Sequence, residues 1–77
     1  MEKMTVTGLR ADAIERAIHA GFYGINGDND EAREARKVCN KAVTELLEML
    51  EIRYDSFEVL DAKMTGNRKA QILFKID

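Results

Sequence analysis

Residues 69–76 alternate strictly between two kinds of position, and this alternation constrains the fold more than any other feature of the sequence. Every second residue is apolar: Ala70, Ile72, Phe74 and Ile76. A period of two is typical of a β-strand that packs one face on a core and turns the other toward solvent. The chain therefore has to supply at least one neighbouring strand and a layer that covers the apolar face.

Residues 56–64 predict this neighbour, as the first strand of a C-terminal β-hairpin. Their pattern is less regular, because the apolar residues are divided between the two faces: Leu60, Ala62 and Met64 on one, Phe57 and Val59 on the other. A β-bulge near Val59 or Leu60 accounts for the change of face. Partial cover of both faces is the alternative.

The turn of the hairpin lies between Met64 and Lys69. A loop with an odd number of residues places Met64 on the same face as Ala70, whereas a two-residue loop at Gly66-Asn67 does not. We therefore expect a three-residue loop in which Gly66 or Asn67 has a positive φ angle.

The N-terminal part of the chain predicts a short edge strand and a helix. Residues 3–7 alternate weakly, and residues 8–21 carry apolar side chains at helical spacing. Thr7 is the expected N-cap of this helix, and Gly21 or Gly24 is expected to end it in the left-handed conformation.

Residues 29–53 predict a second, longer helix of roughly 36 Å. Asp28 and Glu31 match the capping-box pattern at its start. The expected fold is therefore a single α+β domain over residues 1–77, in the order (β)ααββ. A long amphipathic helix and a short helix pack on a small antiparallel sheet that contains the C-terminal hairpin.

The composition is that of a small globular domain. The chain has 77 residues, of which 45% are hydrophobic and 34% charged. A domain of this size buries only about 60% of the surface of its unfolded chain. Its single cysteine allows no internal disulfide, so a partner subunit is the remaining way to enlarge the interior.

Charge and hydropathy exclude several classes of function. The net charge is −2, whereas non-specific nucleic-acid binders are usually basic. No apolar run approaches the ~18 residues of a membrane span, and the first residues have no signal-peptide pattern. With a lone thiol, these features favour the cytoplasm and no contact with membranes.

No group of residues predicts catalysis, a metal or a cofactor. The acidic loop with Asp28 and Asp30 has oxygen ligands but departs from the EF-hand pattern, and helix capping explains it better. His19 has Glu15 one turn before it but no nucleophile nearby, and Cys39 lies among apolar positions typical of an inert core thiol. We therefore expect a protein that is not an enzyme.

The tetrapeptide Gly21-Phe22-Tyr23-Gly24 lies between the two expected helices, after the expected first strand. This placement resembles that of the G-x-x-G loop of KH domains, and the resemblance implies contact with single-stranded nucleic acid. It covers four residues and the element order. The middle pair is aromatic, a further acidic loop precedes the second helix, and no third helix follows the hairpin, so we do not assign the family.

Nucleic-acid binding is accordingly the alternative function, and it is not favoured. In that hypothesis two aromatic residues stack on bases and three basic residues near the hairpin turn contact phosphates: Phe22 and Tyr23, with Lys63, Arg68 and Lys69.

The order of charges along residues 29–53 favours a different partner. After the capping acids, the basic residues come first and the acidic ones last, which opposes the helix dipole. An antiparallel copy of the helix would set one half against the other, with small residues at the contact. The expected interface residues are Arg33, Ala35, Arg36, Lys37, Lys41, Ala42, Glu45 and Glu48.

The sequence thus predicts a homodimeric, non-catalytic module that binds or inhibits an unidentified protein partner. Small acidic domains without catalytic groups fit such accessory roles, including those of phage or mobile-element proteins. A solvated helix face without a partner is the alternative to the dimer.

Overall fold

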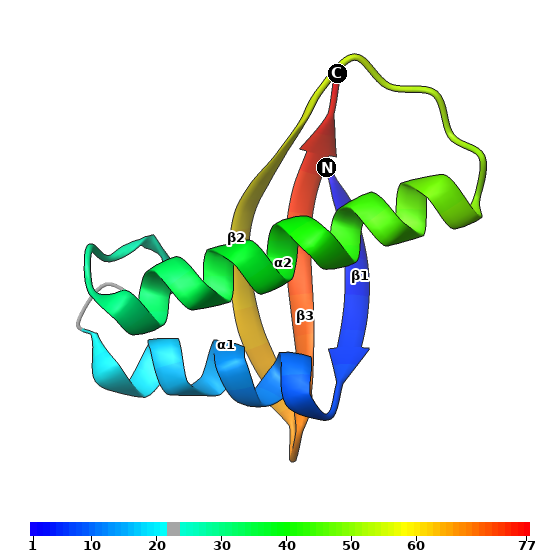
Figure 1. Ribbon diagram of the computed structural model, residues 1–77. Coiled ribbons are helices and arrows are strands. Elements are labelled where there is room, and N and C mark those ends of the chain that lie inside the picture. The colour runs from blue at the N-terminus through cyan, green and yellow to red at the C-terminus, as the bar shows by residue number, and fades with distance from the viewer. Residues whose placement is uncertain (22–23) are drawn as a thin grey trace.

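The computed structural model describes residues 1–21 and 24–77. Two helices pack on one face of a three-stranded antiparallel sheet (Figure 1). The elements follow one another in this order: β1 (Glu2–Thr7), α1 (Leu9–Ala20), a short 3-10 turn η1 (Gly24–Asn26), α2 (Asp30–Met49), β2 (Phe57–Gly66) and β3 (Lys69–Ile76). The predicted α+β fold is confirmed, and the first strand does belong to the sheet.

β3 is the central strand, because the strands lie side by side in the order β1-β3-β2. Ile72 faces Met4 of β1 on one side and Ala62 of β2 on the other. Ala70, Ile72 and Phe74 are buried beneath the helices. The alternation of residues 69–76 is therefore that of a strand paired along both edges and covered on one face.

The predicted bulge in the first hairpin strand is confirmed. The register of β2 against β3 shifts between Val59 and Asp61, which leaves Leu60 as the extra residue. Because of this residue, Phe74 lies opposite Val59. The shift turns the start of β2 so that Phe57 and Val59 also pack against the core.

The hairpin turn places Met64 on the expected face, but the loop differs from the prediction. Met64 does lie opposite Ala70, yet a second register shift between Met64 and Gly66 absorbs one residue, and Gly66 pairs with Lys69. The connection is thus shorter than predicted, and the positive φ angle falls on Arg68 (φ 51) rather than on Gly66 or Asn67.

The start of α1 differs from the prediction. Thr7 is the last residue of β1, and Gly8 is the N-cap, with no side-chain hydrogen bond to the helix. Gly8 has φ +67 and ψ −135, a conformation that glycine adopts readily. The backbone therefore reverses from strand to helix within one residue. Gly21 ends α1 in an extended conformation, not a left-handed one.

Asn29, not Asp28, caps the start of α2. Its side-chain oxygen accepts a hydrogen bond from the amide of Ala32 at 2.7 Å, so the capping-box prediction is wrong by one residue.

At its other end α2 stops at Met49, four residues before the predicted end. The amide of Ile52 donates to the carbonyl of Leu47, and the amide of Glu51 donates to that of Glu48. Glu51 has φ 56. These two bonds around a left-handed residue form a Schellman motif, which reverses the chain although no glycine is present.

The core lies between the helices and β3. α2 contributes a buried stripe that is small near its start and larger near its end: Ala32, Ala35, Cys39, Ala42, Val43 and Leu47. Small side chains in the first half let α2 approach α1 and the sheet closely. Leu47 is among the largest fully buried side chains described.

We expect Leu47→Ala to lower the free energy of unfolding by about 2–5 kcal/mol, because it leaves a cavity in a packed interior. Urea denaturation followed by circular dichroism measures the change. Leu50→Ala, at the C-cap of α2 and largely exposed, is the matched control and should cost about 1 kcal/mol or less. Equal losses in the two variants would contradict the described core.

Candidate functional site

The C-terminal part of α2 extends beyond the edge strand β1 (Figure 1) and encloses an apolar groove with it. The groove has a volume of about 500 Å³. Its apolar lining comes from β1, β3, α2 and the residues after α2: Met4, Leu46, Leu47, Leu50, Ile52, Phe74 and Ile76. We call it the α2–β1 groove.

The Schellman motif at the end of α2 builds one wall of this groove. It folds the chain back so that the amide of Ile52 reaches the carbonyl of Leu47. A hydrophobic contact between the residue after the turn and the last helical turn usually accompanies this motif. Here Leu50 remains 55% and Ile52 40% exposed. The groove therefore presents apolar surface that the chain itself does not cover.

The edge of β1 offers hydrogen-bonding groups beside the groove. The amide of Gly8 donates to the carbonyl of Arg68, and the β1–β3 register continues without a shift from there. In an antiparallel ladder the bonded positions alternate. The amides and carbonyls of Lys3, Thr5 and Thr7 therefore point away from β3, toward the outer edge.

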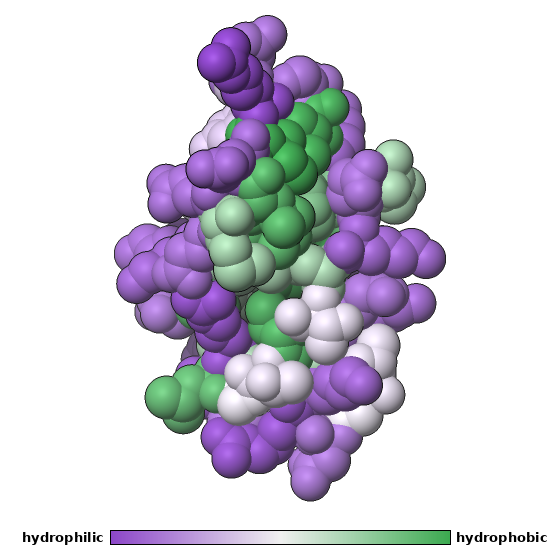
Figure 2. Space-filling view, turned by 90° about the vertical axis from the view of Figure 1, so that its right-hand side faces the viewer, coloured by the Kyte–Doolittle hydropathy of each residue, from purple (hydrophilic) through white to green (hydrophobic). Residues whose placement is uncertain are grey.

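A second hollow follows the same edge on the side of α1. It has a volume of about 470 Å³ and is lined by residues 4–7 together with Leu9 and Arg10. It shares Met4 and Thr5 with the α2–β1 groove. Figure 2, which looks at this side of the molecule, shows an apolar patch with hydrophilic residues on either side and near-neutral residues toward its lower end. The edge of β1 thus runs between two hollows.

The sequence did not predict this site. Its signal is an excess of large apolar residues around the end of α2, where Leu46, Leu47, Met49, Leu50 and Ile52 are too many for one buried stripe. Met49 is among the exposed large hydrophobic residues, so the surplus lies outside the core.

The small residues predicted for the helix interface face the interior instead. Ala35 is 0% and Ala42 1% exposed, because both pack in the protein's own core. They offer no surface to a second copy, and the close antiparallel approach of two α2 helices is not available. Lys37, Lys41 and Glu48 do remain exposed.

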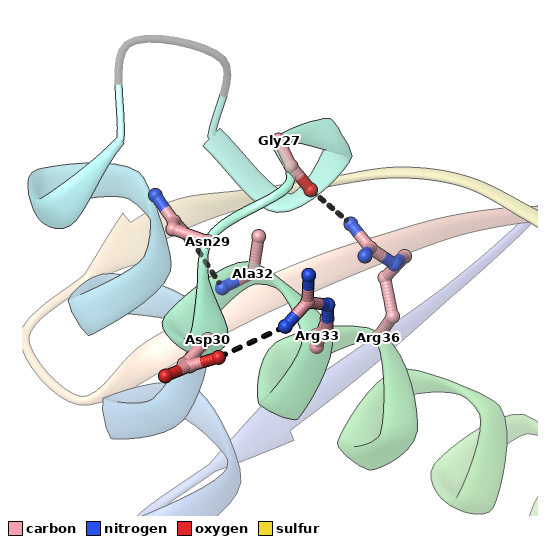
Figure 3. Close-up of polar contacts among 6 residues, drawn as sticks. All are labelled: Gly27, Asn29, Asp30, Ala32, Arg33 and Arg36. Carbon is pink, nitrogen blue, oxygen red and sulfur yellow. Dashed lines mark hydrogen bonds and ion pairs between the residues drawn. The ribbon is translucent and has the colours of Figure 1, made fainter.

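Three charged residues of the predicted interface have partners within the chain. Arg36 donates from Nη1 to the carbonyl of Ile25 at 2.6 Å and to that of Gly27 at 2.7 Å, and so holds η1 and the following loop against α2. Figure 3 shows the contact with Gly27. Two of the others form ion pairs: Arg33 with Asp30 at 2.9 Å and Glu45 with Arg10 of α1. Part of the unusual charge order of α2 therefore serves contacts inside the domain.

The residues of the nucleic-acid hypothesis are only partly brought together. Phe22 and Tyr23 lie outside the described residues. Arg68 forms a bidentate ion pair with Asp12 of α1, with Nε–Oδ1 and Nη2–Oδ2 distances of 3.3 and 3.0 Å. Lys63 and Lys69 are exposed.

The uncovered face of the sheet carries several lysines. By the alternation of the strands, Lys63 and Lys69 share the face opposite the helices with Lys3 and Lys75. Lys75 pairs with Glu58 at 3.3 Å. This face is basic in a chain whose net charge is negative.

The remaining candidates for chemistry stand apart from one another. Within residues 1–21 and 24–77, no three histidine, cysteine or acidic side chains lie close enough to hold a metal ion. His19 is exposed and 3.9 Å from Glu15. Cys39 is fully buried, and this burial raises the pKa of its thiol to about 11, with a smaller contribution from the Asp61 carboxylate.

Comparison with known proteins gives no match. No family model fits the chain, and no significant similarity is found among curated proteins or solved structures. Within the part of the chain that the structure describes, neither helix is both long and apolar enough to cross a membrane.

The raised pKa of Cys39 predicts a pH dependence of stability. Above about pH 9 the thiol ionises in the unfolded chain, but the folded protein keeps its proton up to about pH 11. Unfolding then releases a proton, so the free energy of unfolding falls as the pH rises through this range. Urea denaturation at about pH 8 and about pH 10.5 should show a larger loss for the wild type than for Cys39→Ala. Equal losses would show that the thiol ionises alike in both states.

Proposed function

We propose that the protein is a non-catalytic, cytoplasmic binding module that takes a protein segment along the β1 edge and in the α2–β1 groove. One observation carries the proposal: the free backbone groups of an edge strand lie directly beside an apolar groove that the chain leaves open. The candidate reactive side chains, His19 and Cys39, stand apart from one another, which supports an accessory or inhibitory role, as in phage or mobile-element proteins.

The two parts of the site supply different terms of the binding free energy. An added strand gains main-chain hydrogen bonds from Lys3, Thr5 and Thr7, and these bonds do not depend on its sequence. Apolar side chains of the ligand that enter the groove gain about 25 cal/mol for each Å² removed from water. Leu50 and Ile52 would provide this contact and the preference for apolar ligands.

Site-specific photo-crosslinking in the expressing cell tests the proposal. We expect a benzophenone amino acid in place of Leu50 to form a defined protein adduct, since this side chain lies in the groove. The same probe in place of Lys37, which is exposed on α2 but does not line the groove, is the matched control. Gel electrophoresis and mass spectrometry identify the adducts. A Leu50 probe that gives no more adduct than the Lys37 probe would refute the binding role.

Nucleic-acid binding remains a second candidate, supported by the basic face of the sheet. A single strand laid across this face would meet Lys3, Lys63 and Lys69. No aromatic residue of the described strands lies on this face, because Phe57 and Phe74 pack against the core. Electrostatic contact with phosphates, without stacking, would therefore dominate.

We expect the double substitution Lys63→Glu with Lys69→Glu to weaken any binding of a fluorescent single-stranded oligonucleotide by about tenfold or more, with a smaller salt dependence. Lys37→Glu changes the charge of an exposed α2 side chain and is the control. Fluorescence anisotropy at low salt measures the affinity. Absence of binding by the wild type at low salt would eliminate this candidate.

A further inference from the structure

We infer that the occupant of the β1 edge is a second copy of this chain, joined by antiparallel pairing of the two β1 strands about a two-fold axis at Thr5. The pairing joins two three-stranded sheets into one of six strands, with all four helices on one face. This inference rests on the proposed binding role of the β1 edge and names its partner.

The free backbone groups of β1 are complementary to themselves in this register. The outward-pointing residues are Lys3, Thr5 and Thr7, as the Gly8–Arg68 hydrogen bond and the β1–β3 register require. With the axis at Thr5, Lys3 lies opposite Thr7 of the second copy and Thr5 lies opposite Thr5. All three positions then form bonded pairs, which gives about six hydrogen bonds across the junction.

Other registers use the edge less well. An axis at Lys3 sets two lysines directly opposite each other, which is unfavourable. An axis at Met4 sets Thr7 opposite Met1, which precedes β1, so only two of the three outward positions pair within the strand. An axis at Thr7 drives the second strand into α1, which begins at Leu9. The axis at Thr5 is therefore the one that pairs all three outward positions within β1.

The side chains agree with the same register on both faces. Residues that are directly opposite in an antiparallel pair point to the same face. On the core face, half-buried Met4 meets Val6 of the second copy, which is an apolar pair. On the other face Thr5 meets Thr5, a pair that is favourable between strands.

The most exposed apolar side chains of the described residues also meet across this axis. Met1 is 78% and Leu9 79% exposed, and they flank the two ends of β1. In the register centred on Thr5, residue 1 lies opposite residue 9 of the second copy. Leu9 then approaches the α2–β1 groove of its neighbour, whose lining includes residues 2–5. The same arrangement therefore covers Met1, Leu9 and part of the α2–β1 groove.

The shape of the sheet favours β1 over β2 as the site of contact. β2 is the other edge of the sheet, but it has register shifts at Leu60 and Thr65. Such bulges interrupt the regular ladder that a second strand needs.

Sedimentation velocity of the purified protein at micromolar concentration tests the inference. We expect twice the chain mass of 8.7 kDa for the wild type and for Thr5→Val, which keeps the outward amide. Thr5→Pro removes this amide without removing a bond to β3, so it should sediment as a monomer. Circular dichroism of each variant monitors the fold.

Leu9→Asp provides a second variant if Thr5→Pro does not fold. An acidic residue in the first turn favours the helix, so the fold should be kept while the dimer dissociation constant rises at least tenfold. A monomeric wild type, or folded Thr5→Pro and Leu9→Asp proteins that stay dimeric through the same concentrations, would overturn the inference.

The crosslinking experiment separates this result from the proposed function. Adducts of the Leu50 probe with the chain itself support the dimer. Adducts only with another protein, together with a monomeric wild type, overturn the dimer and leave the binding role standing. Loss of both signals would remove both proposals.

Discussion

The pairing of β3 with a strand on each side is the constraint on which the rest of the structure depends. Ala70, Ile72 and Phe74 are buried because two helices cover that face of the strand and two strands protect its edges. A sheet of three strands can protect only its middle one. The consequence is that β1 and β2 are both edges. The chain blunts β2 with two register shifts, whereas β1 stays regular and open.

The charges of α2 show how tertiary contacts outweigh a local preference. Arg36 lies in the second turn of the helix, where the unfavourable effect of the dipole on a positive charge has already weakened. It donates two hydrogen bonds, to the carbonyl of Ile25 in η1 and to that of Gly27 just after η1. Hydrogen bonds from charged groups contribute about 1.5–3 kcal/mol each. Glu45 likewise joins α2 to Arg10 of α1. Part of a pattern that suggests an external partner thus has an internal cause.

The sequence was sufficient to predict the fold because the spacing of apolar residues along the chain reflects which face of each strand or helix is buried. In the structure, the alternating apolar residues of 69–76 lie on the covered face of β3, and the apolar residues at helical spacing form the buried stripe of α2. The errors lie where backbone geometry decides. Neither the Schellman motif at Glu51 nor the positive φ of Arg68 uses the glycine or asparagine that such conformations favour, so composition could not reveal them.

The candidate site was harder to predict for a related reason. Leu50 and Ile52 look like a continuation of the buried stripe as long as the helix is taken to reach residue 53. Only when α2 ends at Met49 and the chain turns back do they become an exposed wall. Similarly, which amides of β1 face outward depends on the register with β3, and a single sequence does not fix it.

The order of the strands along the chain has a consequence for how the protein acquires its structure. The middle strand of the sheet is the last of the three in sequence, and the β1–β3 ladder joins residues as distant as Glu2 and Phe74. Closing so long a loop is entropically costly and slow compared with forming α1, α2 or the hairpin. During synthesis β1 therefore waits without a neighbour until residues 69–76 have been added. In that interval a chaperone, or a finished molecule with an open edge, competes for it.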